Sequence, residues 1–586
     1  MKNILIKSLI AIAVIVLTGC NDLLNDNRYP LTSITDGPLY WNNEDNCKLQ
    51  TNRFYQYFYN YGSGGGTGDF YFITLTDDQV SGTGGSFTRW KNTSVPASSS
   101  SYSDPYAIIR GCNYIIKNIG NSSLDDTKKG HYVGIARMMR GYYYYLLTRR
   151  YGDVPLVTEV LDPESEELYL PRNSRKEVMD FAYEDIYYAS QHITTTGKQV
   201  FSKDMANAML SDVCLWEGTF WKYCTQADNG YAPDEARASQ YLNRCVEASQ
   251  GLISAYPISD DYHALYNSTW GSNSYGITTL SGNKEIIFAC EYKQDGFMHS
   301  TIDYTCSSTA QAGVSKDAFD AYLFLDGKPA ALTSLDNTDL GVPVEHMEGA
   351  DDNGPGLSIT NLLKVRDQRL AATIDSVVYY KGMSWRRGDA GAMQSTSSSG
   401  YGVCKYDNVK YPNAYRSTSG KNFSSCPIYW GSVVALNYAE AKAELGTLND
   451  NDLNMTLNKL YARGGLPAQT VASLTSMNDP ANNMGVSSLI WEVRRCRRCE
   501  LIMDNDFRYW DLNRWHQLIL LDSTQNPNIL LGANVSNSLV AAESTVNGYI
   551  DASLGQQRIY ESRQYLYPIP SGQITLNPAL TQNPGW

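Results

Sequence analysis

Apolar residues recur every three or four positions in several stretches of the chain, which is the spacing of one face of an α-helix. One stripe lies between residues 135 and 146 and consists of Ile135, Met138, Met139, Tyr142, Tyr145 and Leu146. Gly152 follows, with Pro155 just beyond it, and this pair predicts that the helix ends at Gly152. The pattern therefore predicts a helix with one buried face.

Three further stripes predict helices of the same kind. Ser174 and Glu177 match a capping box, so a helix is expected to begin at Ser174. The stripes themselves consist of Val178, Phe181, Ala182, Ile186 and Ala189, then Met205, Met209, Val213, Trp216 and Phe220, and later Val434, Tyr438, Ala441 and Leu445 before Gly446. Paired helices of this type can stack into a repeat scaffold. We therefore expect a mainly α fold with a tetratricopeptide-like scaffold, although no regular repeat of about 34 residues is visible.

Long irregular stretches separate the predicted helices. Residues 61–104, 266–312 and 380–427 are rich in Gly and Ser, with aromatic residues between them. Compact domains seldom keep loops of this length without a function, and loops on a rigid scaffold commonly hold binding residues. We expect these stretches to form the ligand face.

The N-terminus has the pattern of a secretory signal. Lys2 and Lys7 precede an uncharged run from Leu9 to Leu17, which is too short to span a bilayer, and Gly19-Cys20 follows. This ending resembles the lipobox of bacterial lipoproteins, whose Cys is lipidated; the alternative is a buried N-terminal helix with an incidental Cys. The expected organisation is a signal peptide at 1–19, a lipidated tether at 20–30 and one domain at 31–586. Within that domain we expect a helical-repeat part at about 31–260 and a loop-rich and C-terminal part at about 261–586.

Charge and composition narrow the possible functions. The 586 residues carry 48 Lys plus Arg and 61 Asp plus Glu, a formal net charge of −13. An acidic surface repels phosphate backbones, so a nucleic-acid partner is not expected. The chain also has 44 Tyr. A Tyr ring with its polar tip suits a hydrated binding surface, although most of these rings are expected to pack between helices.

Motifs for catalysis or for a cofactor are missing from the sequence. It has no H-E-x-x-H, no G-x-S-x-G and no Walker A motif. Asp351-Asp352-Asn353-Gly354 lacks the spaced Glu of a calcium loop. Cys496 and Cys499 form a C-x-x-C within a helical pattern, and no second such pair completes a zinc site. We therefore predict no enzyme activity, no metal and no cofactor, while metal or redox chemistry at the C-x-x-C remains the alternative.

The order of short motifs along the chain resembles the SusD/RagB family, surface lipoproteins of Bacteroidetes that partner a TonB-dependent outer-membrane transporter. The motifs that carry the resemblance are Tyr40–Asp45, Tyr106–Ile119, Ala136–Pro155, Leu325–Pro329, Arg366–Leu370, Tyr438–Ala441, Arg463–Pro467, Asp511–Trp515, Tyr565–Pro570, Asn577-Pro578 and Thr581–Trp586. The chain departs from the family pattern at Cys496 in place of Glu, at Gln368 in place of Pro and at Tyr461 in place of Arg, and it has an extra residue around Asp504 to Arg508. Arg494 to Arg498 are expected to pair with Glu492, Glu500 and Asp511 in a packed helix.

The resemblance implies a lipid-anchored protein on the cell surface of the outer membrane. It would capture an oligo- or polysaccharide and deliver it to a SusC-like transporter. Aromatic rings can stack on the CH faces of a sugar, while Asp, Asn and Arg bind its hydroxyls. From loop position and residue type, the predicted ligand residues are Tyr71, Asp77, Asp78, Arg89, Trp90, Asn92, Trp270, Tyr275 and Tyr292.

Two other functions stay open at this stage. The same architecture could bind peptides or glycopeptides, since an acidic face attracts basic peptides. A surface hydrolase would need two facing carboxylates. With 61 acidic residues, the sequence alone cannot support the choice of such a pair.

Overall fold

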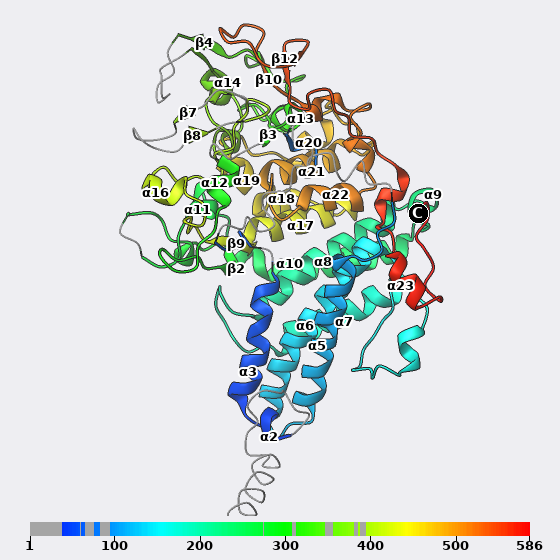
Figure 1. The fold of residues 1–586 in the computed structure, drawn as a ribbon. Coiled ribbons are helices and arrows are strands. Elements are labelled where there is room, and N and C mark those ends of the chain that lie inside the picture. Colours follow the sequence, from blue (N-terminus) through cyan, green and yellow to red (C-terminus); the bar gives the residue numbers. More distant parts are fainter. Residues whose placement is uncertain are drawn as a thin grey trace, which may run out of the picture.

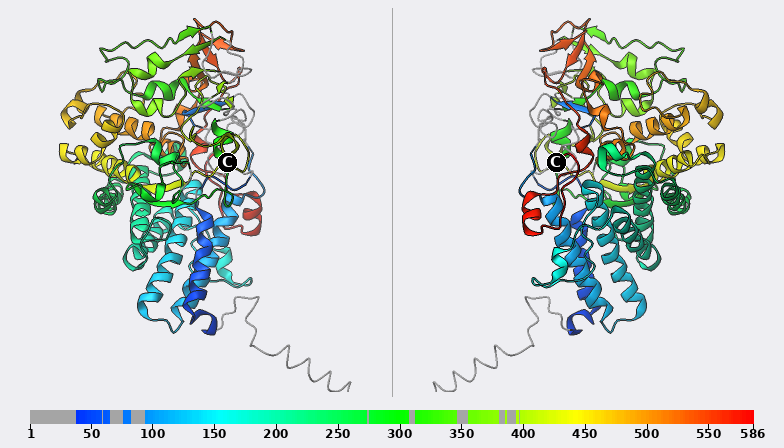
Figure 2. Two further views of the ribbon diagram at one scale, coloured as in Figure 1. Left: turned by 90° about the vertical axis from the view of Figure 1, so that its left-hand side faces the viewer. Right: turned by 90° about the vertical axis from the view of Figure 1, so that its right-hand side faces the viewer.

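Long helices pack side by side in a stack that runs through both halves of the chain (Figures 1 and 2). In packing order, these helices are α5 (Ser100–Gly120), α6 (Asp126–Tyr151), α7 (Arg175–His192), α8 (Lys203–Tyr223), α10 (Glu235–Ala255), α17 (Gly431–Glu444) and α21 (Ser488–Glu500). The contact between α10 and α17 joins the N-terminal helices to the C-terminal half. The expected mainly α fold is confirmed, and its stack extends beyond the N-terminal part of the chain.

The computed structural model describes residues 38–58, 60–64, 76–81, 94–272, 275–306, 312–345, 355–379, 385–386, 394–395 and 397–586. Cys20 and the predicted signal peptide lie outside these residues. Within the described part, which begins at residue 38, no helix is both long enough and apolar enough to cross a membrane.

The predicted helix boundaries agree with the structure. Helix α6 ends at Tyr151, and Gly152 follows with a φ of 71°, a conformation that glycine adopts without strain. Ser174 and Glu177 form the expected capping box at the start of α7. The apolar stripe of α8 is buried along its whole length. Local capping and periodicity thus determine these helices, as the sequence indicated.

A two-stranded ribbon, β2 (Ile286–Cys290) with β9 (Cys426–Trp430), lies between two hydrophobic cores. Successive side chains of a strand point to opposite faces. Ile286 accordingly packs in the core of the C-terminal half, while Ile287 packs in the core of the helical half. Trp430 and Tyr429 divide between the two cores in the same way. The ribbon therefore connects the two cores through both of its faces.

Short elements complete the two halves around this scaffold (Figure 1). The remaining helices are α2 (Pro38–Trp41), α3 (Glu44–Asn52), α9 (Gln226–Asn229), α11 (His263–Tyr266), α12 (Thr301–Cys306), α13 (Lys316–Ala321), α14 (Thr360–Lys364), α15 (Gln368–Ala371), α16 (Asn413–Arg416), α18 (Asp450–Met455), α19 (Leu457–Arg463), α20 (Val471–Ser476), α22 (Phe507–Arg514) and α23 (Ser571–Leu576). The 3₁₀ turns are η1 (Arg53–Tyr57), η3 (Glu166–Tyr169), η4 (Leu280–Gly282), η5 (Leu518–Leu521), η6 (Pro527–Leu530) and η7 (Ser562–Tyr565). The other strands are β1 (Gln79–Ser81), β3 (Ala312–Val314), β4 (Val342–Val344), β5 (Gly356–Ser358), β6 (Val377–Val378), β7 (Trp385–Arg386), β8 (Gln394–Ser395), β10 (Leu531–Asn534), β11 (Thr545–Val546) and β12 (Tyr549–Asp551).

These strands form small antiparallel sheets. Strand β1 pairs with β3, and β7 pairs with β8. The order β4-β5-β6 makes one three-stranded sheet, and β10-β12-β11 makes another. Each of these sheets has only two or three short strands, so the helical stack is the scaffold of the described chain.

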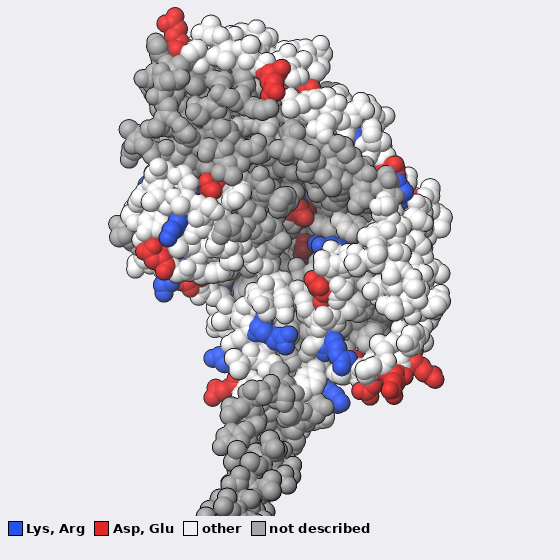
Figure 3. Space-filling view, viewed as in Figure 1, with Lys and Arg blue, Asp and Glu red and all other residues white. Residues whose placement is uncertain are grey.

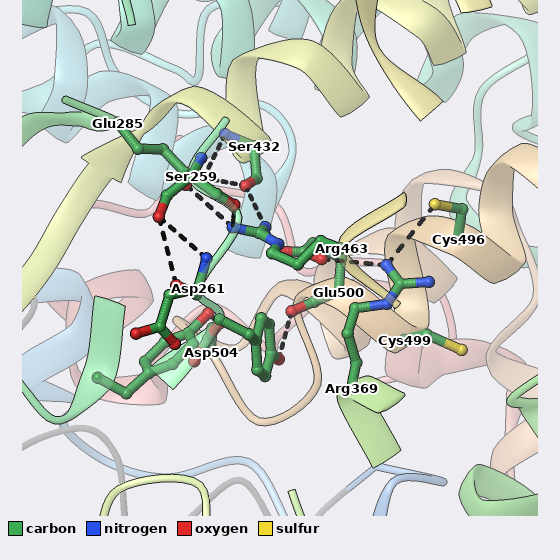
Figure 4. Close-up of polar contacts among 12 residues, drawn as sticks. Ser259, Asp261, Glu285, Arg369, Ser432, Arg463, Cys496, Cys499, Glu500 and Asp504 are labelled. Atoms are coloured by element: carbon green, nitrogen blue, oxygen red, sulfur yellow. Dashed lines mark hydrogen bonds and ion pairs between the residues drawn. The ribbon is translucent and has the colours of Figure 1, made fainter. Parts of the chain in front are cut away.

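A buried ion network holds α15, α19 and α21 together (Figure 4). Glu500 accepts hydrogen bonds from Arg463 and from Arg369, the latter at 3.0 Å. Arg463 also reaches Glu285 at 3.0 Å and Ser432 at 2.8 Å. All of these side chains are buried. Burial disfavours a charged Glu500, but Arg463 and Arg369 outweigh burial and lower its pKa.

The arginine-rich end of α21 is packed only partly as predicted, because Arg494 pairs with Glu444 and Arg498 pairs with Asp78. Arg497 pairs with Asp511 at 2.7 Å, and Arg495 lies 3.1 Å from Glu492. Glu500 instead pairs with Arg369 and Arg463, because it faces α15 and α19. Cys496 and Cys499 are buried thiols, and burial raises the pKa of Cys496 to about 12. Within the described residues, no group of three metal-ligating side chains is present.

Glu492 is expected to make the stability of the fold depend on pH. Neither of its carboxylate oxygens has a hydrogen-bond partner, and burial raises its pKa from 4.5 to about 7, although Arg495 opposes this shift. A raised pKa in the folded state gives stability below about pH 4.5 that is lost as the pH rises through about 7. Glu492→Gln should therefore gain on the order of 2–3 kcal/mol relative to the wild type between pH 4.5 and 8. Urea unfolding of both proteins across this range measures the difference, and a difference that is constant with pH would contradict the prediction.

Candidate ligand-binding face

The predicted ligand residues fall into three groups. Tyr71, Arg89, Trp90 and Asn92 lie outside the described residues. Three others are buried in the fold, namely Asp77, Asp78 and Tyr292. Trp270 and Tyr275 are half-buried on one loop.

Asp77 and Asp78 belong to an internal ion network, and their prediction as ligand residues is corrected. Their exposed fractions are 1% and 0%. Asp77 accepts two hydrogen bonds from Arg508, at 2.8 and 2.6 Å, and Asp78 accepts one from Arg498 at 2.8 Å. Burial opposes a charge on Asp77, yet Arg498 and Arg508 outweigh it and lower its pKa to about 2. These carboxylates therefore connect the start of strand β1 to α21 and α22.

Tyr292 positions a loop, and its prediction as a contact residue is also corrected. It is 1% exposed, and its hydroxyl donates to the Gly62 carbonyl at 2.6 Å. Its ring stacks on Phe297 with 4.7 Å between ring centres. Burial raises the pKa of Tyr292. The Tyr292 ring therefore packs against the Phe297 ring, and its hydroxyl binds the backbone at Gly62.

Tyr275 belongs to a group of aromatic and polar side chains, here called the loop-tip cluster (Tyr275, Gln294, Asp295, Phe297 and Tyr415), in which Asp295 and Phe297 are exposed and the others are half-buried. The Gln294 amide donates to the Tyr415 hydroxyl at 2.9 Å and lies 3.5 Å from that of Tyr275. The ring centres of Tyr275 and Tyr415 are 6.3 Å apart. The Tyr415 hydroxyl lies 3.4 Å from both carboxylate oxygens of Asp295. One amide, one carboxylate and two phenols thus meet at one site.

A tight turn presents the rest of the loop-tip cluster to solvent. Lys293 donates its backbone N–H to the Phe297 carbonyl at 2.8 Å, and Asp295 has a φ of 56°. Phe297 is 48% exposed, although a large apolar ring is usually buried. Asp295 is also exposed. The turn therefore holds an aromatic face next to a carboxylate in contact with water.

Two rings of the loop-tip cluster, those of Tyr275 and Tyr415, pack against the hydrophobic core of the C-terminal half. Phe423 is buried, and its ring centre lies 5.3 Å from Tyr415 and 6.4 Å from Tyr275. Tyr415 belongs to α16, and α16 lies beside α11 and α12 on the left of Figure 1. Side chains that are already held by the core lose less conformational entropy when a ligand binds.

The chain that leads toward Tyr71 is tied to the same turn. Gly64 donates its N–H to the Met298 carbonyl at 2.8 Å and accepts from the Ser300 hydroxyl at 2.8 Å. Thr301 donates to the Tyr61 carbonyl at 3.0 Å. Segment 61–64 is thus bonded to residues 298–301, which directly follow Phe297.

Sequence reasoning missed Gln294, Asp295, Phe297 and Tyr415 as individual residues. All of them lie in the stretches 266–312 and 380–427, which were expected to form the ligand face. The signal that could have found Phe297 and Tyr415 is an aromatic residue within a Gly- and Ser-rich loop. Their meeting depends on the pairing of β2 with β9, which is a tertiary contact.

A second hollow lies where the helical half meets the C-terminal half. Figure 3 shows a hollow near the centre of the molecule, with charged side chains of both signs in it. The cavity has a volume of about 450 Å³, and α5, α6, α8 and α22 contribute to its lining. Arg149 lies over the Trp510 ring at 4.1 Å, and Asp212 also faces the cavity. Burial raises the pKa of Asp212, while Arg497 and Arg149 oppose the shift. Rings and charges here could bind a polar ligand, but no sequence-predicted residue of the described chain lines this hollow.

Two family models match the chain. The model described as "SusD family" matches residues 284–586, and the model described as "Starch-binding associating with outer membrane" matches residues 73–215. The first match alone spans more than half of the chain. The chain therefore belongs to the SusD family, as its motifs predicted.

Curated relatives and solved structures agree with this membership. SusD-like proteins P2 and P38 of Formosa agariphila are each 30% identical, over 30% and 34% of this chain. The matched stretches cover only 37% and 40% of those two relatives.

Among solved structures, a SusD-like carbohydrate binding protein from Bacteroides fragilis is 20% identical with a TM-score of 0.65, covering 92% of this chain and 100% of that one. A laminarin binding SusD-like protein is 17% identical with a TM-score of 0.53, covering 93% of this chain and 100% of that one. The surface glycan-binding protein A from Bacteroides fluxus is 15% identical with a TM-score of 0.55 and the same coverage. At these identities the likeness establishes the fold, a tetratricopeptide-like helical scaffold of the SusD type.

Proposed function

We propose that this protein is a non-enzymatic, surface-exposed lipoprotein that captures an oligo- or polysaccharide and delivers it to a TonB-dependent outer-membrane transporter. The observation that carries the proposal is the loop-tip cluster. Phe297 and Tyr415 offer ring faces to the CH groups of a sugar, while Gln294 and Asp295 offer hydrogen bonds to its hydroxyls. Binding of this kind needs no nucleophile and no metal.

The comparisons support glycan as the cargo. One matching family model is described as starch-binding and as associating with the outer membrane. Two structural neighbours are a laminarin binding SusD-like protein and a surface glycan-binding protein. The described part of the loop-tip cluster contains one carboxylate, that of Asp295, so it lacks the facing pair that a glycosidase uses.

The proposed location follows from the N-terminal pattern. Lipidation of Cys20 would attach the domain through the tether at residues 20–30. Each buried CH₂ of an acyl chain, such as palmitate, contributes about 0.8 kcal/mol, so two or more chains hold a protein on a membrane. A stable contact with the SusC-like transporter should bury more than about 1,000 Å².

A glycan-array screen of the protein starting after Cys20, with a matched peptide library, tests the proposed cargo. We expect specific retention of one glycan class, with affinity in the micromolar to millimolar range because the cargo must be released. Trp90→Ala should weaken that binding at least tenfold with little change in melting temperature, as its loop position predicts. Retention of peptides without glycans would replace the cargo with peptide, and release of reducing ends from the glycans would contradict a non-enzymatic role.

A further inference from the structure

A further cavity, distinct from the loop-tip cluster and from the hollow beside Trp510, lies among α13, α21, η6 and the segment 329–339. Its volume is about 530 Å³. Charged side chains of both signs line it, and the acidic members are Asp77, Asp317, Asp320, Asp339 and Asp479. The basic members are Lys316, Arg366, Arg494, Arg495, Arg498 and Arg508.

All but one of these basic side chains have a carboxylate partner. Arg508 pairs with Asp77 at 2.6 Å and Arg498 with Asp78 at 2.8 Å. The remaining pairs are Arg494 with Glu444, Arg495 with Asp479, and Lys316 with Asp320. Paired charges of this kind are internal to the fold and do not call for a ligand.

Arg366 is the exception, since it makes no ion pair with any described residue. It is 2% exposed, and its Nε has no hydrogen-bond partner. Within the described residues, its side chain donates only from Nη1, to the Phe319 and Tyr322 carbonyls at the long distances of 3.5 and 3.4 Å. The guanidinium lies over the rings of Phe319 and Phe324, at 4.6 and 4.3 Å. A buried guanidinium that lacks an anion leaves most of its hydrogen-bonding capacity unused.

The nearest acidic groups are already engaged. Asp320 is paired with Lys316, and Asp339 accepts hydrogen bonds from Asn534 and Tyr549. Burial lowers the pKa of Arg366, and the charges of Asp320 and Asp339 oppose that shift without forming a pair with it. An anion supplied by a ligand would therefore complete the coordination of Arg366.

Neutral groups around the cavity could bind the rest of a polar ligand. The side chains of Asn483 and Asn528 line it and make no hydrogen bond within the described chain. Trp491 lines it as well and is half-buried. We propose that this cavity is a separate binding site for a small oxyanion-bearing ligand, such as a sugar carboxylate, with Arg366 as the anion-binding residue.

This site differs in chemistry from the loop-tip cluster. A guanidinium binds a carboxylate or a sulfate through parallel N–H bonds, which a neutral hydroxyl cannot match. The amides of Asn483 and Asn528 suit sugar hydroxyls, and the Trp491 ring suits a sugar face. The proposal does not depend on glycan capture at the loop-tip cluster, because no residue is shared between the two sites.

Isothermal titration calorimetry of the protein starting after Cys20 tests the site, with sodium glucuronate, sodium sulfate and glucose at constant ionic strength. We expect glucuronate to bind and to raise the melting temperature, and glucose to do neither. Binding of glucuronate alone identifies a carboxylated sugar, while binding of sulfate as well identifies a general oxyanion site; both support the proposal. No binding of either anion, or equal binding of glucose, would overturn it.

Variants assign the binding to this cavity. Arg366→Gln should weaken glucuronate binding at least about tenfold, because a charge-assisted hydrogen bond is lost. Asn528→Asp adds a repelling charge at a half-exposed position and should weaken binding several-fold without changing the melting temperature. Asn243→Asp, at an exposed position on α10, is the matched control and should leave binding unchanged.

Buried Arg366 could be needed for folding, and in that case Asn528→Asp decides the question. Unchanged affinity in every variant that folds would overturn the assignment. Tyr415→Ala should leave glucuronate binding intact, so failure of this site and failure of the proposed glycan capture are distinguishable.

Discussion

Replacing Glu500 with alanine is expected to lower the free energy of unfolding by about 3–5 kcal/mol. Glu500 is the shared acceptor of Arg369 and Arg463, and all of these side chains are buried (Figure 4). Its removal leaves Arg369 with Asp367 and Arg463 with Glu285, so each guanidinium loses one of its two carboxylate partners. Removing one partner from a buried ion network leaves N–H groups that water cannot reach without hydrogen bonds, and this costs several kcal/mol in addition to the lost packing. Urea unfolding followed by circular dichroism measures the shift.

The matched control for this variant is Glu166→Ala. Glu166 is exposed on η3, so its replacement should change the free energy of unfolding by less than about 0.5 kcal/mol. Glu500→Gln keeps the shape and removes the charge, and it should be destabilising because the amide NH₂ that replaces one carboxylate oxygen is a donor and would face a guanidinium. A loss below about 1 kcal/mol for Glu500→Ala would contradict the prediction, because it would show that other groups replace the hydrogen bonds that Arg369 and Arg463 make to Glu500.

Tyr415→Ala is expected to weaken glycan binding at least tenfold, which corresponds to about 1.4 kcal/mol. The Tyr415 ring supplies a stacking face, and its hydroxyl holds Gln294 and Asp295 in place. The variant therefore removes a stacking surface and also frees the two polar groups that bind hydroxyls. Tyr415→Phe keeps the ring and loses the hydroxyl, so its effect should be intermediate. Titration of each variant with the glycan found by the array screen gives the affinities.

Tyr169→Ala is the control for this second prediction. Tyr169 is 56% exposed on η3, within the helical half, and should not contribute to binding. Melting temperatures of Tyr415→Ala and Tyr415→Phe must be compared with that of the wild type, because Tyr415 also packs on Phe423. Wild-type affinity in a folded Tyr415→Ala protein would remove the loop-tip cluster from the glycan site.

Local sequence signals were sufficient for the scaffold. The capping box at Ser174, the glycine after α6 and the apolar stripe of α8 each act within a few residues of the chain. Such interactions are encoded where they occur, so their spacing can be read directly. The motif order along the chain extended this reading to the SusD family, to which the chain belongs.

The ligand face could be predicted only as a set of loops. Asp77 and Asp78 resembled exposed loop carboxylates, but their partners Arg498 and Arg508 lie more than 400 residues away in the sequence. Tyr292 resembled a contact residue, but the fold uses it to anchor Gly62. Residue type cannot separate a buried ion pair from a ligand group, because both need the same chemistry.

The sequence by itself determined the helices, their caps and the family, and it indicated the stretches that are proposed to form the ligand face. Tertiary structure alone decided which polar residues of those stretches are buried and which meet solvent. The reason is physical: burial depends on the pairing of segments such as β2 and β9, whose residues lie about 140 positions apart. The same long-range packing brought Gln294 to Tyr415 and left Arg366 without an anion.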